Sequence, residues 1–419
     1  MRPQTLLPIL IGGALGAAGL LQGLQWRRAA AAAGGEQLES RVRELEREVD
    51  LLERENQSLR SLAQGGGEVH VDPALIGFVE EALGLDFRSN PVVHRIAPEE
   101  LRDRVTASIE SRFPPNSLDH RQQAWVLMGL LAPDDRFAAQ LAATRSLGAR
   151  SWFDDQTGEA WVTDRFDERS VPDQAALVRA LARVLLHQHE PPPPGYPGDE
   201  ADRSREALHH GAALAVDNRY LARQAIASGF AGSQVQSDAA DLLDSLPVAI
   251  RGLATFPSRL GAPRAERLLE AGELRDALHD PPRRTAWFYP EPALPARDPE
   301  LPATPGTAVL EESAGMLGLQ LWLQTVDPEL APLAGAWRGD RYRLSAADDT
   351  ALSLVWDLRL ADADQADAIA PQALAIAGLL AGSAEDPPVG ETIEAPGGRR
   401  ITVLRPEPDL LRFLNQAAP

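Results

Sequence analysis

The chain has 419 residues, of which 44% are hydrophobic, so it can bury a core in one large domain or two ordinary ones. Its formal charge of -20 argues against nucleic acid or an anionic lipid surface as the main partner, because both would repel it. Cysteine is absent, which excludes disulfides and thiolate chemistry and leaves His, Asp and Glu as the metal ligands available.

The chain begins with an uncharged segment, residues 5–26, that is long enough to span a bilayer as a helix. A cleaved signal peptide is the alternative, because the alanines of residues 29–33 offer a small-residue cleavage site. The apolar segment is longer than the usual signal core. We therefore predict a single-pass anchor over residues 1–28, with the rest of the protein at the membrane on the periplasmic side.

A heptad pattern over residues 36–64 predicts a short parallel coiled coil. Leucine at one core position, with valine and one asparagine at the other, is typical of a two-stranded coil. We expect a homodimer, with a single amphipathic helix packed on the main domain as the alternative, and a flexible joint at residues 65–68. The expected dimerisation residues are Leu38, Val42, Leu45, Val49, Leu52, Asn56 and Leu59.

The rest of the chain alternates helical periods with short β-like segments. It predicts an α+β fold that is mainly helical and has small antiparallel sheets. The expected elements are a strand at residues 91–96, helices from residue 98, at residues 122–131, 136–147 and 174–190, from residue 199 and at residues 364–380 with a kink at Pro371, hairpins turning at residues 155–158, 346–349 and 396–398, and a helix from Asp409 to the C-terminus.

The helix of residues 174–190 has the shape of a metallopeptidase active-site helix without its zinc ligands. In an HExxH helix, histidines four residues apart share a face and bind zinc together, and the glutamate takes a proton from the metal-bound water. The segment here is RALARVLLHQHE, with arginines and an alanine at those positions. Taken alone, it is more typical of an amphipathic core helix.

In its context the segment resembles a family of bacterial zincin-like metallopeptidases. Members carry a hairpin of the type YDPxTGxLYV, a helix HELTHALQDQHF, a helix with EGDA, and the segments LGELGL and WxGDRY. This chain has FDDQTGEAWV, RALARVLLHQHE, HHGAAL, AGMLGL and WRGDRY in the same order. The resemblance implies a zincin-like region at residues 69–290, a proline-rich linker at residues 291–306 and a C-terminal α+β region at residues 307–419.

The resemblance places the first zinc-binding histidine at Arg179, the catalytic glutamate at Ala180, the second histidine at Arg183 and the third ligand at His210. The glutamate of LGELGL is replaced by Met316. Arginine stays protonated and has no lone pair to give to a metal. We therefore expect no zinc cofactor and a catalytically inactive, metallopeptidase-like protein that binds or scaffolds another protein.

Two other functions remain open. A hydrolase with a relocated metal site would use His187 and His210, because His187 continues the helix stripe of Arg179 and Arg183. A structural spacer in an envelope assembly would need no site. No dinucleotide-binding, P-loop or serine-nucleophile motif occurs, and the sequence does not define the partner protein.

Overall fold

The computed structural model describes residues 69–146, 148–228, 243–290, 297–304, 306–347, 352–383 and 388–417. Glu68–Pro419 forms one compact unit, separate from Met1–Gly67. The predicted coiled coil, the joint and the dimerisation residues lie outside the described ranges, so the homodimer stays a prediction.

The predicted fold class is wrong in including a transmembrane helix. Within the described ranges, no helix is both long enough and apolar enough to cross a membrane. The longest helix described, α8 (Asp199–Ser228), has 30 residues but begins with Asp199, Glu200 and Asp202, and carboxylates are costly in a bilayer core. The apolar segment behind the prediction, residues 5–26, lies outside the described residues.

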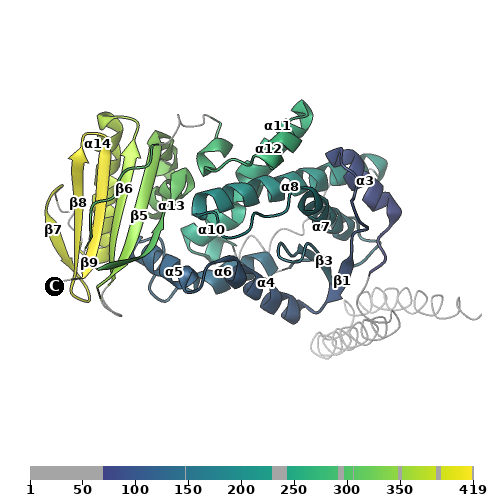
Figure 1. The fold of residues 1–419 in the computed structure, drawn as a ribbon, viewed down its shortest axis with the longest axis horizontal. Helices are drawn as coiled ribbons and strands as arrows, with labels where there is room; N and C mark the ends of the chain where they lie inside the picture. The colour runs from purple at the N-terminus through teal and green to yellow at the C-terminus, as the bar shows by residue number, and fades with distance from the viewer. Residues whose placement is uncertain are drawn as a thin grey trace, which may run out of the picture. The chain divides into compact units, whose positions relative to one another are not determined.

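The N-terminal part of this unit is mostly helical and contains a small three-stranded sheet (Figure 1). The sheet has the order β1-β3-β2, with β1 parallel and β2 antiparallel to β3, so the expectation of purely antiparallel sheets is wrong here. The parallel strands β1 and β3 need a long crossover connection, and three helices and β2 lie between them in the chain. The elements are α3 (Pro73–Leu83), β1 (Val93–Ile96), α4 (Pro98–Arg112), α5 (Ser117–Met128), α6 (Phe137–Ser146), β2 (Ser151–Phe153), β3 (Ala160–Thr163), α7 (Val171–His189), α8, α10 (Val248–Phe256), the π-helical turn η1 (Pro257–Gly261), α11 (Ala262–Ala271), α12 (Leu274–His279) and the 3-10 turn η2 (Thr285–Phe288).

A large antiparallel sheet dominates the C-terminal part, with α14 packed along it in Figure 1. Its strand order is β4-β5-β6-β9-β8-β7, so this sheet is not small. The predicted helix from Asp409 is wrong, because the segment forms β9, paired with β6 and β8. The elements are β4 (Thr307–Glu312), α13 (Gly315–Val326), the 3-10 turn η3 (Pro328–Ala336), β5 (Trp337–Ala346), β6 (Leu352–Leu360), α14 (Ala363–Ala381), β7 (Thr392–Ala395), β8 (Arg399–Glu407) and β9 (Leu410–Ala417).

The other predicted strand, helices and hairpins are confirmed, with small shifts of their ends, and α14 continues through Pro371 without a break. The predicted strand is β1, the helices are α4 to α8 and α14, and the hairpins are β2–β3, β5–β6 and β7–β8. Helix α7 begins where Ser170 accepts a hydrogen bond from the Asp173 amide, an N-cap. It ends at His189, with Glu190 as the C-cap, before four prolines that cannot continue it.

The helical part and the large sheet share one hydrophobic core. Trp322 of α13 packs edge-on against Trp356 and Phe413 of the sheet, and its indole donates to the carbonyl of Met128 at 2.8 Å. Asn415 of β9 donates to the carbonyl of Leu127 at 3.0 Å. These contacts fix the sheet against the C-terminal end of α5. A second hydrophobic cluster lies under α7, between α3, α8 and the small sheet.

Candidate functional site

Helices α7 and α8 pack side by side and run in opposite directions. Arg179, early in α7, pairs with Asp217 late in α8, while the end of α7 meets the start of α8, where Arg205 donates weakly to the Glu190 carbonyl at 3.4 Å. This pairing brings together the positions that the resemblance equates with zinc ligands.

The arginines at these positions are engaged in ion pairs. Arg179 donates to Asp217 at 3.2 Å, and Arg183 donates to Asp155, in the β2–β3 hairpin, at 2.6 Å. The guanidinium of Arg183 also lies over the ring of Phe153, 5.0 Å from its centroid. Each cation thus has a carboxylate partner, so the two positions that the resemblance equates with zinc ligands hold ion pairs.

The two carboxylates respond differently to their arginines. Burial raises the pKa of Asp155, but the charges of Arg183 and Arg112 outweigh burial and hold it well below its usual range. Burial raises the pKa of Asp217 to about 6, and Arg179 only partly opposes it. The second oxygen of Asp217 is buried without a hydrogen-bond partner in the described part of the chain. The Arg183–Asp155 contact is also the shorter of the two ion pairs.

Position 180, which the resemblance equates with the catalytic base, belongs to the core. Ala180 is 3% exposed and packs in the cluster beneath α7. The methyl group of Ala180 cannot accept a proton. A glutamate at position 180 would place its carboxylate in the hydrophobic cluster beneath α7. Met316 of α13, where the family has a glutamate, is also buried.

The histidines of α7 and α8 belong to no metal-binding group of three among the described residues. His187 lies against the turn at Gly158 and packs edge-on against Phe153, whereas His189 contacts the Asp86 carbonyl at 2.8 Å. Burial, then Arg183 and Arg179, lowers the pKa of His210 to about 3. Burial, then Arg205 and Arg183, lowers the pKa of His209 far below its ordinary value.

These residues do not fit zinc. Among the described residues, no group of three or more His, Asp or Glu side chains is arranged to hold a metal ion. The two sequence candidates, His187 and His210, lack a third ligand, and guanidinium groups stand beside His210. A dication at this position would be repelled by these guanidinium groups.

Carboxylates and arginines continue along α8, one turn before His210. Glu206 accepts from Arg145 at 2.6 Å and from Arg112 at 3.2 Å, and Arg112 also pairs with Asp202 at 2.6 Å. Burial raises the pKa of Glu206, but the charges of Arg145 and Arg112 reverse this and lower it to about 2. The site is therefore a chain of ion pairs rather than a set of metal ligands.

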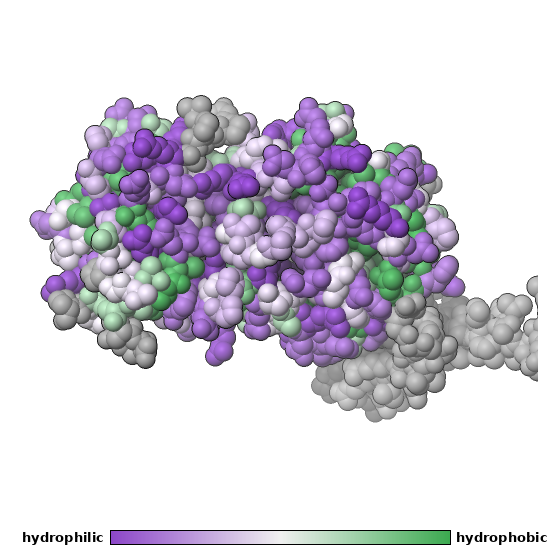
Figure 2. Space-filling model, viewed as in Figure 1, coloured by the Kyte–Doolittle hydropathy of each residue, from purple (hydrophilic) through white to green (hydrophobic). Residues whose placement is uncertain are grey.

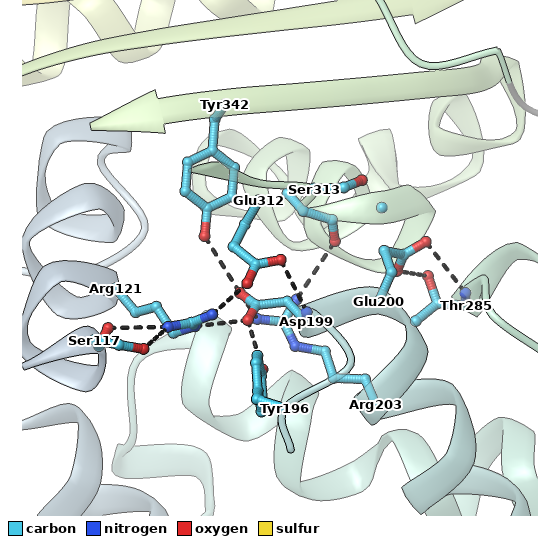
Figure 3. A network of polar contacts seen from close by, with 12 residues as sticks. Ser117, Arg121, Tyr196, Asp199, Glu200, Arg203, Thr285, Glu312, Ser313 and Tyr342 are labelled. Carbon is cyan, nitrogen blue, oxygen red and sulfur yellow. Dashed lines mark hydrogen bonds and ion pairs between the residues drawn. The ribbon is translucent and has the colours of Figure 1, made fainter. Parts of the chain in front are cut away.

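A second buried network, which the sequence did not predict, lies at the N-terminal end of α8 (Figure 3). Asp199 accepts from Arg121 at 2.6 Å and from the Tyr196 hydroxyl at 2.6 Å, and more weakly from Arg203 and Tyr342 at 3.3 Å each. Glu312 of β4 accepts from Arg121 and from the Asp199 amide. The network joins α5, α8 and the large sheet. Its members are far apart in the chain, and no short motif marks them.

Asp340, in the WRGDRY segment, has a structural role. It is fully buried, and both carboxylate oxygens accept hydrogen bonds. The donors are the Ser313 hydroxyl at 2.7 Å, the amides of Ala314 at 2.8 Å and Gly315 at 2.9 Å, and the indoles of Trp337 at 3.0 Å and Trp356 at 2.9 Å. The carboxylate therefore holds the start of α13 against β5 and β6.

A cavity of about 60 Å³ lies between α4, α5, α6, α8, α10 and η1. It adjoins the ion-pair chain, because Arg112, Arg145, Asp202 and Glu206 line one part of its wall. The rest of the wall is largely aromatic and aliphatic.

Comparisons with protein-family models, with characterised proteins and with solved structures find no match for this chain.

Proposed function

We propose that this protein is a catalytically inactive, metallopeptidase-like binding module. The observation that carries the proposal is the pairing of Arg179 with Asp217 and of Arg183 with Asp155, at the positions equated with two zinc ligands. A zinc hydrolase needs a metal-activated water and a base, and a guanidinium neither binds the metal nor takes the proton.

The arrangement of the remaining residues supports a binding role more than a relocated metal site. His187 packs on the hairpin and Ala180 lies in the core, which argues against a relocated metal ligand or base at these two positions. What remains is a partly exposed arrangement of arginines and carboxylates beside a cavity, which suits recognition of a ligand.

Zinc content and peptide hydrolysis test the proposal on the purified full-length chain. We expect far less than one zinc per chain after dialysis against trace zinc, and no cleavage of unfolded protein substrates. Stoichiometric zinc together with zinc-dependent cleavage would overturn the proposal and favour the relocated metal site.

Restoring the ligands tests the resemblance itself. The triple variant Arg179→His, Arg183→His, His210→Glu leaves Ala180 in place, because a glutamate there would be buried in the core. We expect this variant to bind about one zinc per chain, as three protein ligands suffice for a catalytic-type site. If it folds, as judged by circular dichroism, but binds no zinc, α7 is an ordinary core helix and the family resemblance is wrong.

A further inference from the structure

The face of the molecule drawn in Figure 2 is mostly hydrophilic, with hydrophobic residues scattered over it, so that face offers no wide apolar docking area. The buried carboxyl groups are more unusual, because Asp and Glu are rarely buried unless a cation pairs with them. Glu200 is only 5% exposed and has no cation within ion-pair distance in the described part of the chain. The arginines whose charges reach it, Arg203 and Arg284, form their ion pairs with Asp199 and Asp298 instead.

A second buried carboxyl group, that of Asp340, meets Glu200 at Gly315, the first residue of α13. Asp340 accepts a hydrogen bond from the Gly315 amide at 2.9 Å. Glu200 lies against the α-carbon of the same residue, because a Cβ atom on Gly315 would overlap its carboxyl group. Gly315 also has a φ of 74°, which disfavours any other residue there. The two carboxyl groups therefore hold the start of α13 from two sides.

Glu200 also connects α8 to two other elements. Its carboxyl group accepts from the hydroxyl of Thr285 at 2.8 Å and from its amide at 3.3 Å, at the start of η2 (Figure 3). The same hydroxyl accepts from the Leu317 amide of α13 at 3.2 Å. Glu200 thus lies at a joint between α8, η2 and the start of α13, and Asp340 connects this joint to β5 of the large sheet.

A negative charge on Glu200 is poorly compensated in this joint. Asp340 of β5 faces it with a charge of the same sign, and α13 has no ionisable side chain. The cations that face it are Arg203 of α8 and Arg284 before η2, and Tyr289 after η2 is the other titratable group that it influences. Burial, followed by the charge of Asp340, raises the pKa of Glu200 from 4.5 to about 7.

We propose that Glu200 is a pH switch in this joint: when protonated it holds the start of α13 against α8 and η2, and when ionised it allows this contact to open locally. Opening admits water, which stabilises the charge of Glu200, while the strands of the large sheet stay paired. A carboxyl group whose pKa is raised in the closed joint contributes stability that is present below pH 4.5 and is lost as the pH rises to 7. The inference is independent of the proposed binding role, because it concerns an opening within the fold.

Native-state hydrogen exchange on the full-length chain tests the proposal at pH 5 and pH 7.5, with protection factors corrected for the intrinsic effect of pH on exchange. The probes are the amides of Ala314, Gly315 and Leu317, which donate to side chains at the joint. We expect them to exchange through a local opening that does not depend on low concentrations of urea. Their protection should fall on the order of 50-fold between the two pH values, given the shift of the Glu200 pKa.

Two results would overturn the proposal. One is that these amides exchange only together with the centre of the large sheet, in a urea-dependent opening, which would mean that the joint does not open on its own. The other is equal protection at the two pH values.

Glu200→Gln tests whether this carboxyl group is the one that titrates. The amide is neutral at both pH values, so the protection of the three probes should differ less than about threefold between them. Glu300→Gln, at an exposed position, is the matched control and should keep the full change. A full change in Glu200→Gln would assign the effect to another group and refute the switch.

Thr285→Val gives a second test that keeps Glu200 in place. The variant removes a hydroxyl that donates to the carboxyl group and favours its ionised form, so the pKa of Glu200 should rise further. The loss of protection should then continue to a pH higher by roughly half a unit or more before it levels off. A pH profile that levels off at the same pH as in the natural protein would contradict the role of Glu200.

Discussion

Arg183 of α7 donates to Asp155 of the β2–β3 hairpin at 2.6 Å, and the side chains are only 12% and 23% exposed. The pair therefore ties the hairpin to the helix that the sequence singled out. Because both groups are largely removed from water, the loss of one leaves the other poorly solvated.

We expect Arg183→Met to lower the free energy of unfolding by about 2 kcal/mol, since it leaves the Asp155 carboxylate without its closest cation. A double-mutant cycle with Asp155→Asn, measured by urea unfolding, should give a coupling energy of about 1–2 kcal/mol. The pair of Arg223 and Glu81, with side chains 64% and 77% exposed, is the matched control and should couple by less than about 0.5 kcal/mol.

The pH dependence of this coupling follows from the pKa of Asp155, which lies below its ordinary value of 3.8 in the folded state. A depressed carboxylate pKa contributes stability that is fully present above 3.8 and is lost as the pH falls below it. The coupling energy should therefore be constant between pH 5 and pH 8. A coupling that disappears within that range would contradict the assignment of the pair.

Much of the local structure follows from the sequence, because it depends on residues close together in the chain. The turns at Gly158 and Gly397 have positive φ, and the segments predicted as hairpins there form β2–β3 and β7–β8. The helix predicted from Asp409 is wrong because a short apolar run fits a helix or a strand equally well. Its pairing with β6 and β8, which come from elsewhere in the chain, decides for a strand.

The site was predictable only in part. Sequence spacing placed Arg179 and Arg183 on one face of α7, and the structure has both in ion pairs. Their partners Asp217 and Asp155 come from another helix and from a hairpin turn, so no local pattern pointed to them. Tertiary packing alone brings such groups together.

Glu200 is a buried carboxyl group that should make stability depend on pH. Burial, followed by the nearby charge of Asp340, raises its pKa from 4.5 to about 7, while the Thr285 hydroxyl donates to it at 2.8 Å and Arg203 and Arg284 partly offset the shift. The folded state then binds more protons than the unfolded state between these values. Stability should therefore fall as the pH rises from 4.5 to 7, by up to about 3 kcal/mol, and change little above that.

Glu200→Gln should remove this pH dependence, because the amide has no charge to bury. Urea unfolding at pH 8 should show the variant more stable than the natural protein by about 2 kcal/mol, with little gain at pH 5. Glu300→Gln, at an exposed position, is the control and should show no such difference between the two pH values. An equal effect of Glu200→Gln at both pH values would argue against a raised pKa.

Asp340 is expected to be the most sensitive single carboxylate in the large sheet, because it accepts five hydrogen bonds while fully buried. Asp340→Asn turns one acceptor oxygen into a donor that faces other donors. We expect a loss of about 3–4 kcal/mol in the free energy of unfolding. Trp356→Phe removes only one of the donors to Asp340, together with some packing. Its loss in the free energy of unfolding should therefore be smaller than that of Asp340→Asn. A loss below about 1 kcal/mol for Asp340→Asn would show that the start of α13 is held by other contacts.

Gly211, in the segment HHGAAL, has a packing reason to be glycine. Helix α8 crosses η1 so closely that a Cβ atom on Gly211 would lie 2.4 Å from the Gly261 carbonyl carbon and 2.6 Å from its oxygen. These are backbone atoms, which cannot move aside as a side chain would. We expect Gly211→Ala to lower the melting temperature by roughly 5 °C or more, even though alanine favours helix.

Gly77→Ala in α3 is the matched control, since nothing lies within 4 Å of the Cβ position there. It should leave the melting temperature unchanged or raise it slightly, because alanine is favoured over glycine in a helix by up to about 1 kcal/mol. If both variants behave alike in differential scanning calorimetry, α8 and η1 do not approach as described. Because α8 also carries Glu206, His210 and Asp217, the close crossing at Gly211 helps to set where these side chains lie.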